Sequence, residues 1–189
     1  MMEFWFVLFG IFTLVILFPF IRCFFKRLVC AMNIKRMCKR KNLVVHPTHI
    51  LWFFGSKKRK GCDLYIETPT QVLSIKFFGA PRRLSILTLK ENGNYFFRSY
   101  VALLSYGAGF HIPIDGREKK MPNFDFRYQC KKEWNQKKVR NILLASPAPM
   151  EFRYQPNHGA ENIISAGETV RDMQICSLQH LLEELKGEI

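Results

Sequence analysis

The sequence has no acidic residue between residues 22 and 60, although this stretch holds twelve of the chain's 29 Lys and Arg residues. After residue 60, seventeen basic residues are offset by fourteen acidic ones. The net charge of +14 is therefore concentrated in one segment close to the N-terminus. This distribution excludes a domain that is basic all over, and it favours a segment that faces anionic lipid headgroups. The alternatives are a topology signal with no specific partner and a site for nucleic acid.

Several motifs that would identify an enzyme or a metal site are also missing. The six cysteines form no C-x-x-C pair, and the chain has no G-x-S-x-G, H-E-x-x-H or G-K-[ST] motif. Four candidate zinc ligands fall within twenty residues, namely Cys30, Cys38, His46 and His49. Their spacing does not match the close ligand pairs of structural zinc sites. The sequence therefore predicts no resident metal ion or organic cofactor, and in a cytosolic domain the cysteines are expected to be reduced.

One long segment without charge stands at the N-terminus. It runs for eighteen residues from Phe4 to Ile21. As a helix it would be about 27 Å long, close to the roughly 30 Å hydrocarbon core of a bilayer. Glu3 is the only charged residue before it, and no A-x-A-like cleavage site follows it. A cleavable signal peptide would need a positively charged start and such a site, so the segment predicts a transmembrane anchor.

The basic residues that follow this segment set its predicted orientation. Eight of them lie within twenty residues of its end: Arg22, Lys26, Arg27, Lys35, Arg36, Lys39, Arg40 and Lys41. By the positive-inside rule this flank stays on the cytoplasmic side. We therefore expect a single-pass protein of the cell membrane with its N-terminus outside and the rest of the chain in the cytoplasm. The eight residues are the candidate contacts for anionic lipid headgroups.

The chain divides into three predicted regions. These are a transmembrane anchor over residues 1–25, a basic juxtamembrane helix or linker over residues 26–44, and a cytoplasmic domain over residues 45–189. Between residues 22 and 41, apolar side chains recur at helical spacing opposite the basic ones, which predicts an amphipathic helix that lies along or leaves the membrane. Residues 42–47 are expected to break this helix, and the apolar run 49–55 is predicted to be a strand or the first buried segment of the domain.

The segment from Cys62 to Phe78 predicts a β-hairpin. CDLYIE and VLSIKFF both alternate, and the four residues between them, TPTQ, supply turn chemistry. A four-residue loop places Asp63 opposite Lys76, and it places Glu67 opposite Val72. The other face of the hairpin is then entirely apolar. This register is self-consistent, because a slip by one residue would move the acidic side chains onto the apolar face.

Later segments predict further strands and one helix. The strands are expected over residues 84–89, 95–100, 141–146, 150–154 and 173–176. Asn92-Gly93, between the first two, is a strong hairpin signal. Ser177 can cap a helix in which leucines 178, 181, 182 and 185 share one face. Together these elements predict an α/β domain.

The hairpin and the segments after it resemble the core of the restriction-endonuclease-like fold, the PD-(D/E)xK fold of nuclease-related and Mrr-type domains. GCDLYIE and VLSIK carry this resemblance, since they give a strand with an Asp, a short gap and a strand ending in Lys. The later order of a buried strand (NILLAS), another strand and a closing helix is also similar. The resemblance covers roughly residues 45–189. It implies a mixed-sheet α/β fold behind a transmembrane helix, as in short bacterial membrane-anchored proteins.

The resemblance also implies a set of site residues. Active members use two carboxylates that share a divalent metal ion, and a Lys that stabilises charge or positions the attacking water. Asp63 would be the first carboxylate and Lys76 the lysine, with Mg²⁺ or Mn²⁺ as the cofactor. The second acid is expected at position 74, where this chain has Ser74. A substitute would have to come from Glu67, about 13 Å along the strand from Asp63, or from Asp115.

Two interpretations of Asp63 and Lys76 therefore stay open. The pair is either part of a metal-dependent active site or a cross-strand ion pair that contributes about 0.2–1 kcal/mol. Because the second acid is missing, we expect a non-catalytic interaction module on a degenerate endonuclease-like fold, with a protein partner and no cofactor. The alternatives are an active metal-dependent nuclease that acts on DNA near the membrane, and an adaptor that binds anionic lipids through residues 22–60.

Overall fold

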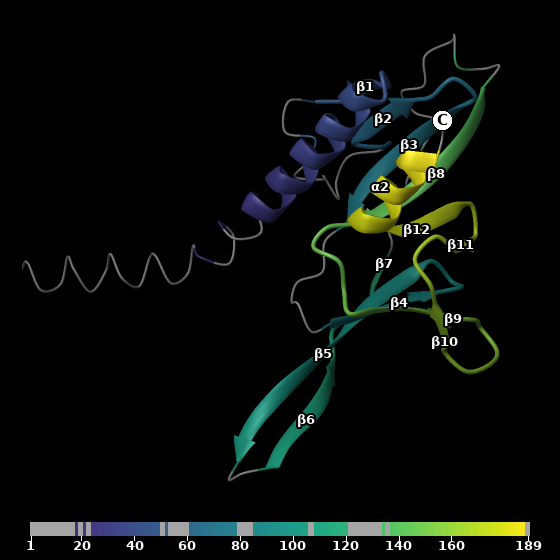
Figure 1. Cartoon of the computed structure of the whole chain (residues 1–189). Coiled ribbons are helices and arrows are strands. Elements are labelled where there is room, and N and C mark those ends of the chain that lie inside the picture. Colours follow the sequence, from purple (N-terminus) through teal and green to yellow (C-terminus); the bar gives the residue numbers. More distant parts are fainter. Residues whose placement is uncertain are drawn as a thin grey trace, which may run out of the picture.

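The computed structural model describes residues 18, 21, 24–49, 52, 61–78, 85–105, 108–120, 134 and 137–187, without the side chains of residues 100–105 and 108–113. Within these ranges the chain forms two mixed β-sheets, a helix over residues 24–40 and a C-terminal helix, α2 (Leu178–Gly187) (Figure 1). The predicted mixed α/β class is therefore confirmed. The second sheet was not expected from the sequence.

The first sheet contains the predicted hairpin. Its strand order is β1 (Val44–Pro47), β2 (Leu64–Glu67), β3 (Gln71–Phe78), β8 (Lys138–Ala145), β12 (Met173–Ser177) and β11 (Thr169–Val170). Strands β3, β8 and β12 are parallel neighbours, and the other pairs are antiparallel. The hairpin register is confirmed, since Glu67 pairs with Val72 and Leu64 with Ile75.

The first described strand lies before the apolar run 49–55. β1 lies at Val44–Pro47 and pairs antiparallel with β2. The structure describes only His49 and Trp52 of that run; neither is in a strand, and Trp52 is buried. β1 follows directly on the turn that ends the helix. Asn42 adopts a left-handed conformation with φ of 54°, so the helix ends there and the chain becomes extended two residues later.

The second sheet is formed by two parts of the chain, one between β3 and β8 and the other between β8 and β11. Its strand order is β10 (Asn162–Ile164), β9 (Glu151–Gln155), β4 (Ser85–Lys90), β5 (Asn94–Ser105) and β6 (Ala108–Asp115), and β7 (Lys119–Lys120) pairs with β5. The predicted Asn92-Gly93 hairpin joins β4 to β5, with φ of 85° at Gly93. Among the described residues, β5 beyond Ser99 pairs only with β6, and the two strands project as an arm (Figure 1).

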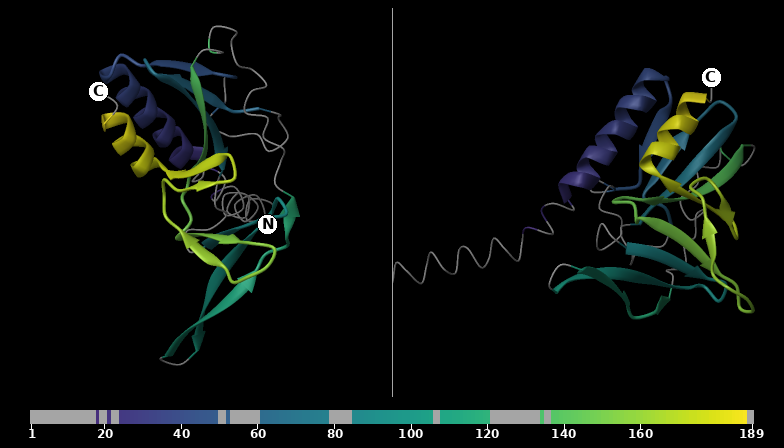
Figure 2. Two further views of the ribbon diagram at one scale, coloured as in Figure 1. Left: turned by 90° about the vertical axis from the view of Figure 1, so that its right-hand side faces the viewer. Right: turned by 60° about the horizontal axis from the view of Figure 1, so that its bottom comes forward.

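Both faces of the first sheet are covered. The helix over residues 24–40 and α2 lie side by side on one face, as Figure 2 shows, and they bury Leu64, Ile75 and Ile142. On the opposite face, Phe78 and Leu143 pack against side chains of the second sheet. Asp63 and Lys76, on the same face of the hairpin as Phe78, are also buried.

The helix over residues 24–40 is an integral part of this core. Cys30, Ala31, Ile34 and Cys38 are buried against the first sheet. Their spacing of one, three and four residues follows one face of a helix. The predicted boundary at residue 45 falls inside β1, and packing joins the helix before it to the sheet after it.

The predicted C-terminal helix is confirmed with its cap. The amide of His180 donates to Oγ of Ser177 at 3.2 Å, and Leu181 and Leu185 are buried. Such a cap satisfies one of the amides that have no partner in the first turn of a helix. The cap thus fixes where α2 leaves β12.

The predicted transmembrane anchor, Phe4 to Ile21, lies outside the described residues except for Phe18 and Ile21. In the part of the chain that the structure describes, no helix is long and apolar enough to cross a membrane.

Candidate functional site

The fold brings Asp63 and Lys76 together, as the hairpin register predicted. Nζ of Lys76 lies 3.4 Å from Oδ1 of Asp63 and donates to the carbonyl oxygen of Gly61 at 2.9 Å. Asp63 is 0% and Lys76 1% exposed, so neither side chain reaches solvent. Of the two interpretations, the geometry matches an ion pair, but a buried one rather than one on the surface.

The second oxygen of Asp63 is bound by the backbone. The amide of Phe77 donates to Oδ2 at 2.9 Å, and the amide of Asp63 itself donates to the carbonyl of Ile75 at 2.8 Å. The carboxylate therefore continues the β2–β3 ladder past the end of β2. Nε2 of His49 lies 3.7 Å from Oδ1, the oxygen that also faces Lys76. Both carboxylate oxygens of Asp63 therefore have partners within the protein.

Position 74 has no acid that could complete a metal site with Asp63. Ser74 is fully buried, and it pairs with Tyr65 on β2 and with Asn141 on β8. Its neutral hydroxyl is a poor substitute for a carboxylate ligand of Mg²⁺. The departure from the family pattern noted in the sequence therefore lies in the middle of the sheet, beside the Asp63–Lys76 pair.

Glu67, the first substitute for the missing acid, belongs to a separate cluster at the far end of β2. Nζ of Lys137 donates to its Oε1 at 2.9 Å, and Nε2 of His46 lies 3.2 Å from Oε2. The hydrogen bond from Lys137 is the main cause that lowers the pKa of Glu67 to about 2. Glu67 is therefore ionised and already paired at neutral pH.

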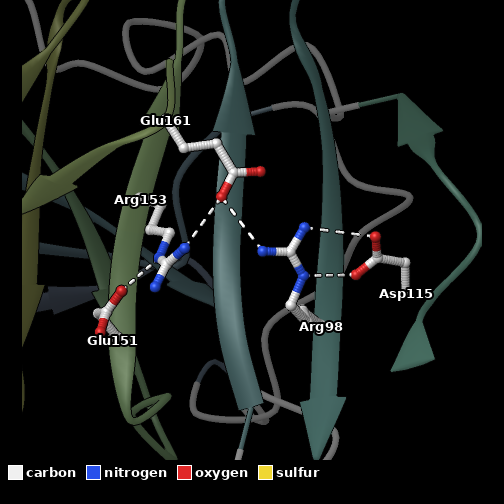
Figure 3. Close-up of polar contacts among 5 residues, drawn as sticks. All are labelled: Arg98, Asp115, Glu151, Arg153 and Glu161. Carbon is white, nitrogen blue, oxygen red and sulfur yellow. Dashed lines mark hydrogen bonds and ion pairs between the residues drawn. The ribbon is translucent and has the colours of Figure 1, made fainter. Parts of the chain in front are cut away.

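Asp115, the second substitute, lies on the second sheet. Its two carboxylate oxygens accept from Arg98 at 2.6 and 3.3 Å, and this bond lowers the pKa of Asp115 (Figure 3). Arg98 also contacts Glu161, which in turn binds Arg153. Asp63, Glu67 and Asp115 thus occupy three separate clusters, and the structure does not assemble them into one site.

The candidate lipid contacts are divided between solvent and the domain. Five of the eight have exposed side chains: Lys26, Lys35, Arg36, Lys39 and Arg40. Nε of Arg27 donates to the carbonyl of Ser146 at 3.1 Å, and Nζ of Lys41 donates to the carbonyl of Lys186 at 3.1 Å. Arg22 lies outside the described residues. The helix therefore has exposed basic side chains, while Arg27 and, directly after the helix, Lys41 bind to the rest of the domain.

The grouping of Cys30 and Cys38 with His46 and His49 is not realised. The two thiols lie in the hydrophobic core, where burial raises the pKa of each to about 11. The two histidines point instead at Glu67 and at Asp63. These four residues therefore do not share a zinc site.

A different cluster of potential metal ligands appears at the junction of β12 and α2. One ligand atom each from Cys176, His180 and Glu184 lies within 4.8 Å of the others. Burial, and next the charge of Glu184, raise the pKa of Cys176 to about 12. Sequence reasoning missed this cluster, although its residues are spaced four and four apart. That spacing was the available signal, but it crosses from a strand into a helix and so matches no single-element motif.

Comparison of the chain with protein-family models, curated protein sequences and solved structures gave no match. The endonuclease-like resemblance therefore stays a proposal. It is based on the motif residues Asp63 and Lys76 and on the order of the strands around them.

Proposed function

We propose that this protein is a non-catalytic interaction module, anchored in the cell membrane by Phe4–Ile21 and holding its α/β domain on the cytoplasmic side. The observation that carries the non-catalytic part is the state of Asp63. Its side chain is fully buried, and each oxygen has a protein partner, Lys76 or the amide of Phe77. A carboxylate enclosed in this way is unsuited to bind a metal ion and a phosphodiester together.

In this proposal, the resemblance to the endonuclease-like fold concerns the fold and not the nuclease activity. The order β1-β2-β3-β8-β12 places the Asp-bearing strand, the Lys-bearing strand, the buried strand and the last strand next to each other in one sheet. α2 then closes the chain over that sheet. Because Ser74 replaces the second acid, we infer that the domain keeps the sheet of such a fold but lacks its metal-dependent nuclease activity.

A second candidate function, a lipid-binding adaptor, is favoured by an exposed apolar stripe. It consists of Phe18, Ile21, Phe25, Val29 and Met32, all more than 40% exposed. Their spacing of three, four, four and three residues follows one face of a helix. Phe25 and Met32, seven residues apart, are separated by about 10 Å along the axis. Apolar side chains flanked by exposed cations are typical of a helix that lies in the interface of an anionic membrane.

The first experiment is a nuclease assay on the full-length protein in detergent micelles. Single- and double-stranded DNA are offered with Mg²⁺ and then with Mn²⁺, and Asp63→Asn is the matched variant. We expect no cleavage by either protein. Cleavage by the wild type that is lost in a folded Asp63→Asn variant would show an active nuclease and overturn the non-catalytic proposal.

The second experiment places the stripe relative to the bilayer. The full-length protein is reconstituted in vesicles with and without anionic lipid, and an environment-sensitive fluorophore is attached at Met32→Cys. Met150→Cys, which is 56% exposed in the domain, is the control. We expect a blue-shifted emission at Met32 that increases with the anionic lipid fraction and decreases with salt. Equal, water-like emission at both positions would exclude the adaptor function.

A further inference from the structure

The cluster of Cys176, His180 and Glu184 contains the ligand types of a transition-metal site. Cys176 lies at the end of β12, and its side chain is on the helix-covered face of the first sheet. His180 and Glu184 are one turn apart on α2, so that both point to the same side of the helix. One ligand atom of each residue lies within 4.8 Å of the other two. The cluster is separate from Asp63 and Lys76, which face the opposite side of the sheet.

The two carboxylate oxygens of Glu184 differ in their hydrogen bonding. Nη2 of Arg140 donates to its Oε1, and Nε of Arg140 donates to Oε1 of Gln174 at 3.0 Å. The other carboxylate oxygen, Oε2, is buried and has no hydrogen-bond partner within the described ranges. Leaving a buried polar oxygen without a partner costs about 1–3 kcal/mol, and more when the group is charged. A bound cation would remove this cost.

His180 is fixed from two directions. Its amide caps onto Ser177, and its imidazole lies against the turn that precedes β11. A Cβ added at Gly167 would lie 2.5 Å from both Cε1 and Nε2 of the ring. Gln174 ties the same turn to the sheet, since its amide nitrogen donates to the carbonyl of Gly167 at 3.0 Å. The ring therefore has little freedom to turn away from Cys176 and Glu184.

We propose that Cys176, His180 and Glu184 bind Zn²⁺, with a water molecule as the fourth ligand. Thiolate and imidazole select zinc over the hard cations Mg²⁺ and Ca²⁺, which prefer sites made of oxygen alone. At usual zinc bond lengths, tetrahedral ligand atoms are about 3.5 Å apart. The side chains would therefore close by about 1 Å from the observed limit of 4.8 Å.

Arg140 is the positioning residue of this site. It keeps Oε1 of Glu184 and so leaves Oε2 for the metal, as outer-shell partners of metal-ligating carboxylates do. Binding exchanges the thiol proton of Cys176 for the cation, so one proton is released for each zinc ion bound. The dication offsets the charges of the thiolate and the carboxylate, while Arg140 keeps its hydrogen bond to Glu184. A bound ion would join β12 to α2 across the turn between them.

The test uses Co²⁺ as a spectroscopic probe and Zn²⁺ as its competitor, with the full-length protein in detergent. Thiolate-bound Co²⁺ gives a near-ultraviolet charge-transfer band, and tetrahedral coordination gives intense visible bands. We expect both at one equivalent of Co²⁺, and we expect Zn²⁺ to displace the probe. Absence of a thiolate band in the wild type would overturn the proposal.

The variants assign the ligands. Cys176→Ser should abolish the charge-transfer band, whereas Cys62→Ser, at a buried thiol outside the cluster, should keep it. A band that survives Cys176→Ser would place the metal on another cysteine and overturn the site. Should Cys176→Ser fail to fold, Glu184→Gln decides, because the amide oxygen still accepts from Arg140 while the carboxylate charge is lost. We expect at least tenfold weaker Co²⁺ binding in that variant, and unchanged affinity would exclude Glu184 as a ligand.

Discussion

Asp63 and Lys76 form an ion pair across the β2–β3 hairpin, with 3.4 Å between Oδ1 and Nζ and almost no exposure of either side chain. Burying two charges is costly, and only their attraction and their hydrogen bonds offset that cost. Lys76 donates to the carbonyl of Gly61, and Asp63 accepts from the amide of Phe77. Each charge therefore depends on the other to offset the cost of its burial.

Asp63→Ala should destabilise the folded protein strongly, because it leaves the ammonium of Lys76 buried without its counter-ion. Losing one partner of a buried pair costs about 3–5 kcal/mol. Denaturant unfolding followed by circular dichroism measures this loss. The double variant Asp63→Leu/Lys76→Met removes both charges and should lose clearly less than the single variant. Additive losses in the cycle would show that the two residues do not depend on each other.

The Glu67 cluster should make stability sensitive to acid. The pKa of Glu67 is lowered from 4.5 to about 2 in the folded protein, chiefly by the hydrogen bond from Lys137. The folded state therefore binds this proton more weakly than the unfolded state. Its contribution is fully present above pH 4.5 and is lost as the pH falls through about 2. Because Glu67 is partly open to water, we expect about 1 kcal/mol rather than the full value of the shift.

Unfolding free energies at pH 7 and pH 3 measure this effect. Glu67→Gln should lose stability at pH 7 and show a smaller further loss at pH 3 than the wild type. Glu168→Gln, at an exposed position, is the control and should follow the wild type. Identical acid profiles for the wild type and Glu67→Gln would rule out Glu67 as a source of the acid sensitivity.

The hairpin shows how much of this fold the sequence alone could predict. Alternation and the turn residues between the strands predicted which residues pair, down to Glu67 with Val72, because register depends on neighbouring residues. The burial of Asp63 could not be predicted in this way. Its contact with His49 comes from outside the hairpin, and the second sheet that packs on the same face at Phe78 and Leu143 was not predicted. A period-two pattern shows which residues share a face, but not what packs on that face.

For the candidate site, too, some features could be predicted from the sequence and others could not. The proximity of Asp63 to Lys76 followed from register, and the absence of an acid at Ser74 was visible in the sequence. The cluster of Glu67 depended on Lys137, which approaches from a distant segment of the chain. A contact of this kind leaves no periodic signal. The pair of Arg98 and Asp115 follows from the register of β5 and β6, a strand pairing that was not predicted from the sequence.

Substitutions on the two faces of the helix over residues 24–40 should differ in their effect on stability. Ile34 is 0% exposed in the core, whereas Met32 is 49% exposed on the apolar stripe. Ile34→Ala should cost about 2–5 kcal/mol, because it leaves a cavity against the first sheet. Met32→Ala should change stability by less than about 0.5 kcal/mol. Thermal and denaturant unfolding measure both, and equal effects would show that the helix does not pack as described.

Gly167 should be the position at which a single methyl group disturbs the proposed metal site. Its φ of +102° is unfavourable for any side chain, and an added Cβ would lie 2.5 Å from the imidazole of His180. Gly167→Ala therefore combines backbone strain with displacement of the ring. Gly159→Ala is the matched control, since Gly159 has φ of +132° but its Cβ would meet the nearest atom, on Pro156, at 3.4 Å.

We expect both variants to lose about 1 kcal/mol or more from backbone strain. Only Gly167→Ala should lose further stability, because its methyl group displaces the ring, and only this variant should bind Co²⁺ more weakly. Equal Co²⁺ affinity in the two variants would mean that the turn before β11 does not hold His180 in place.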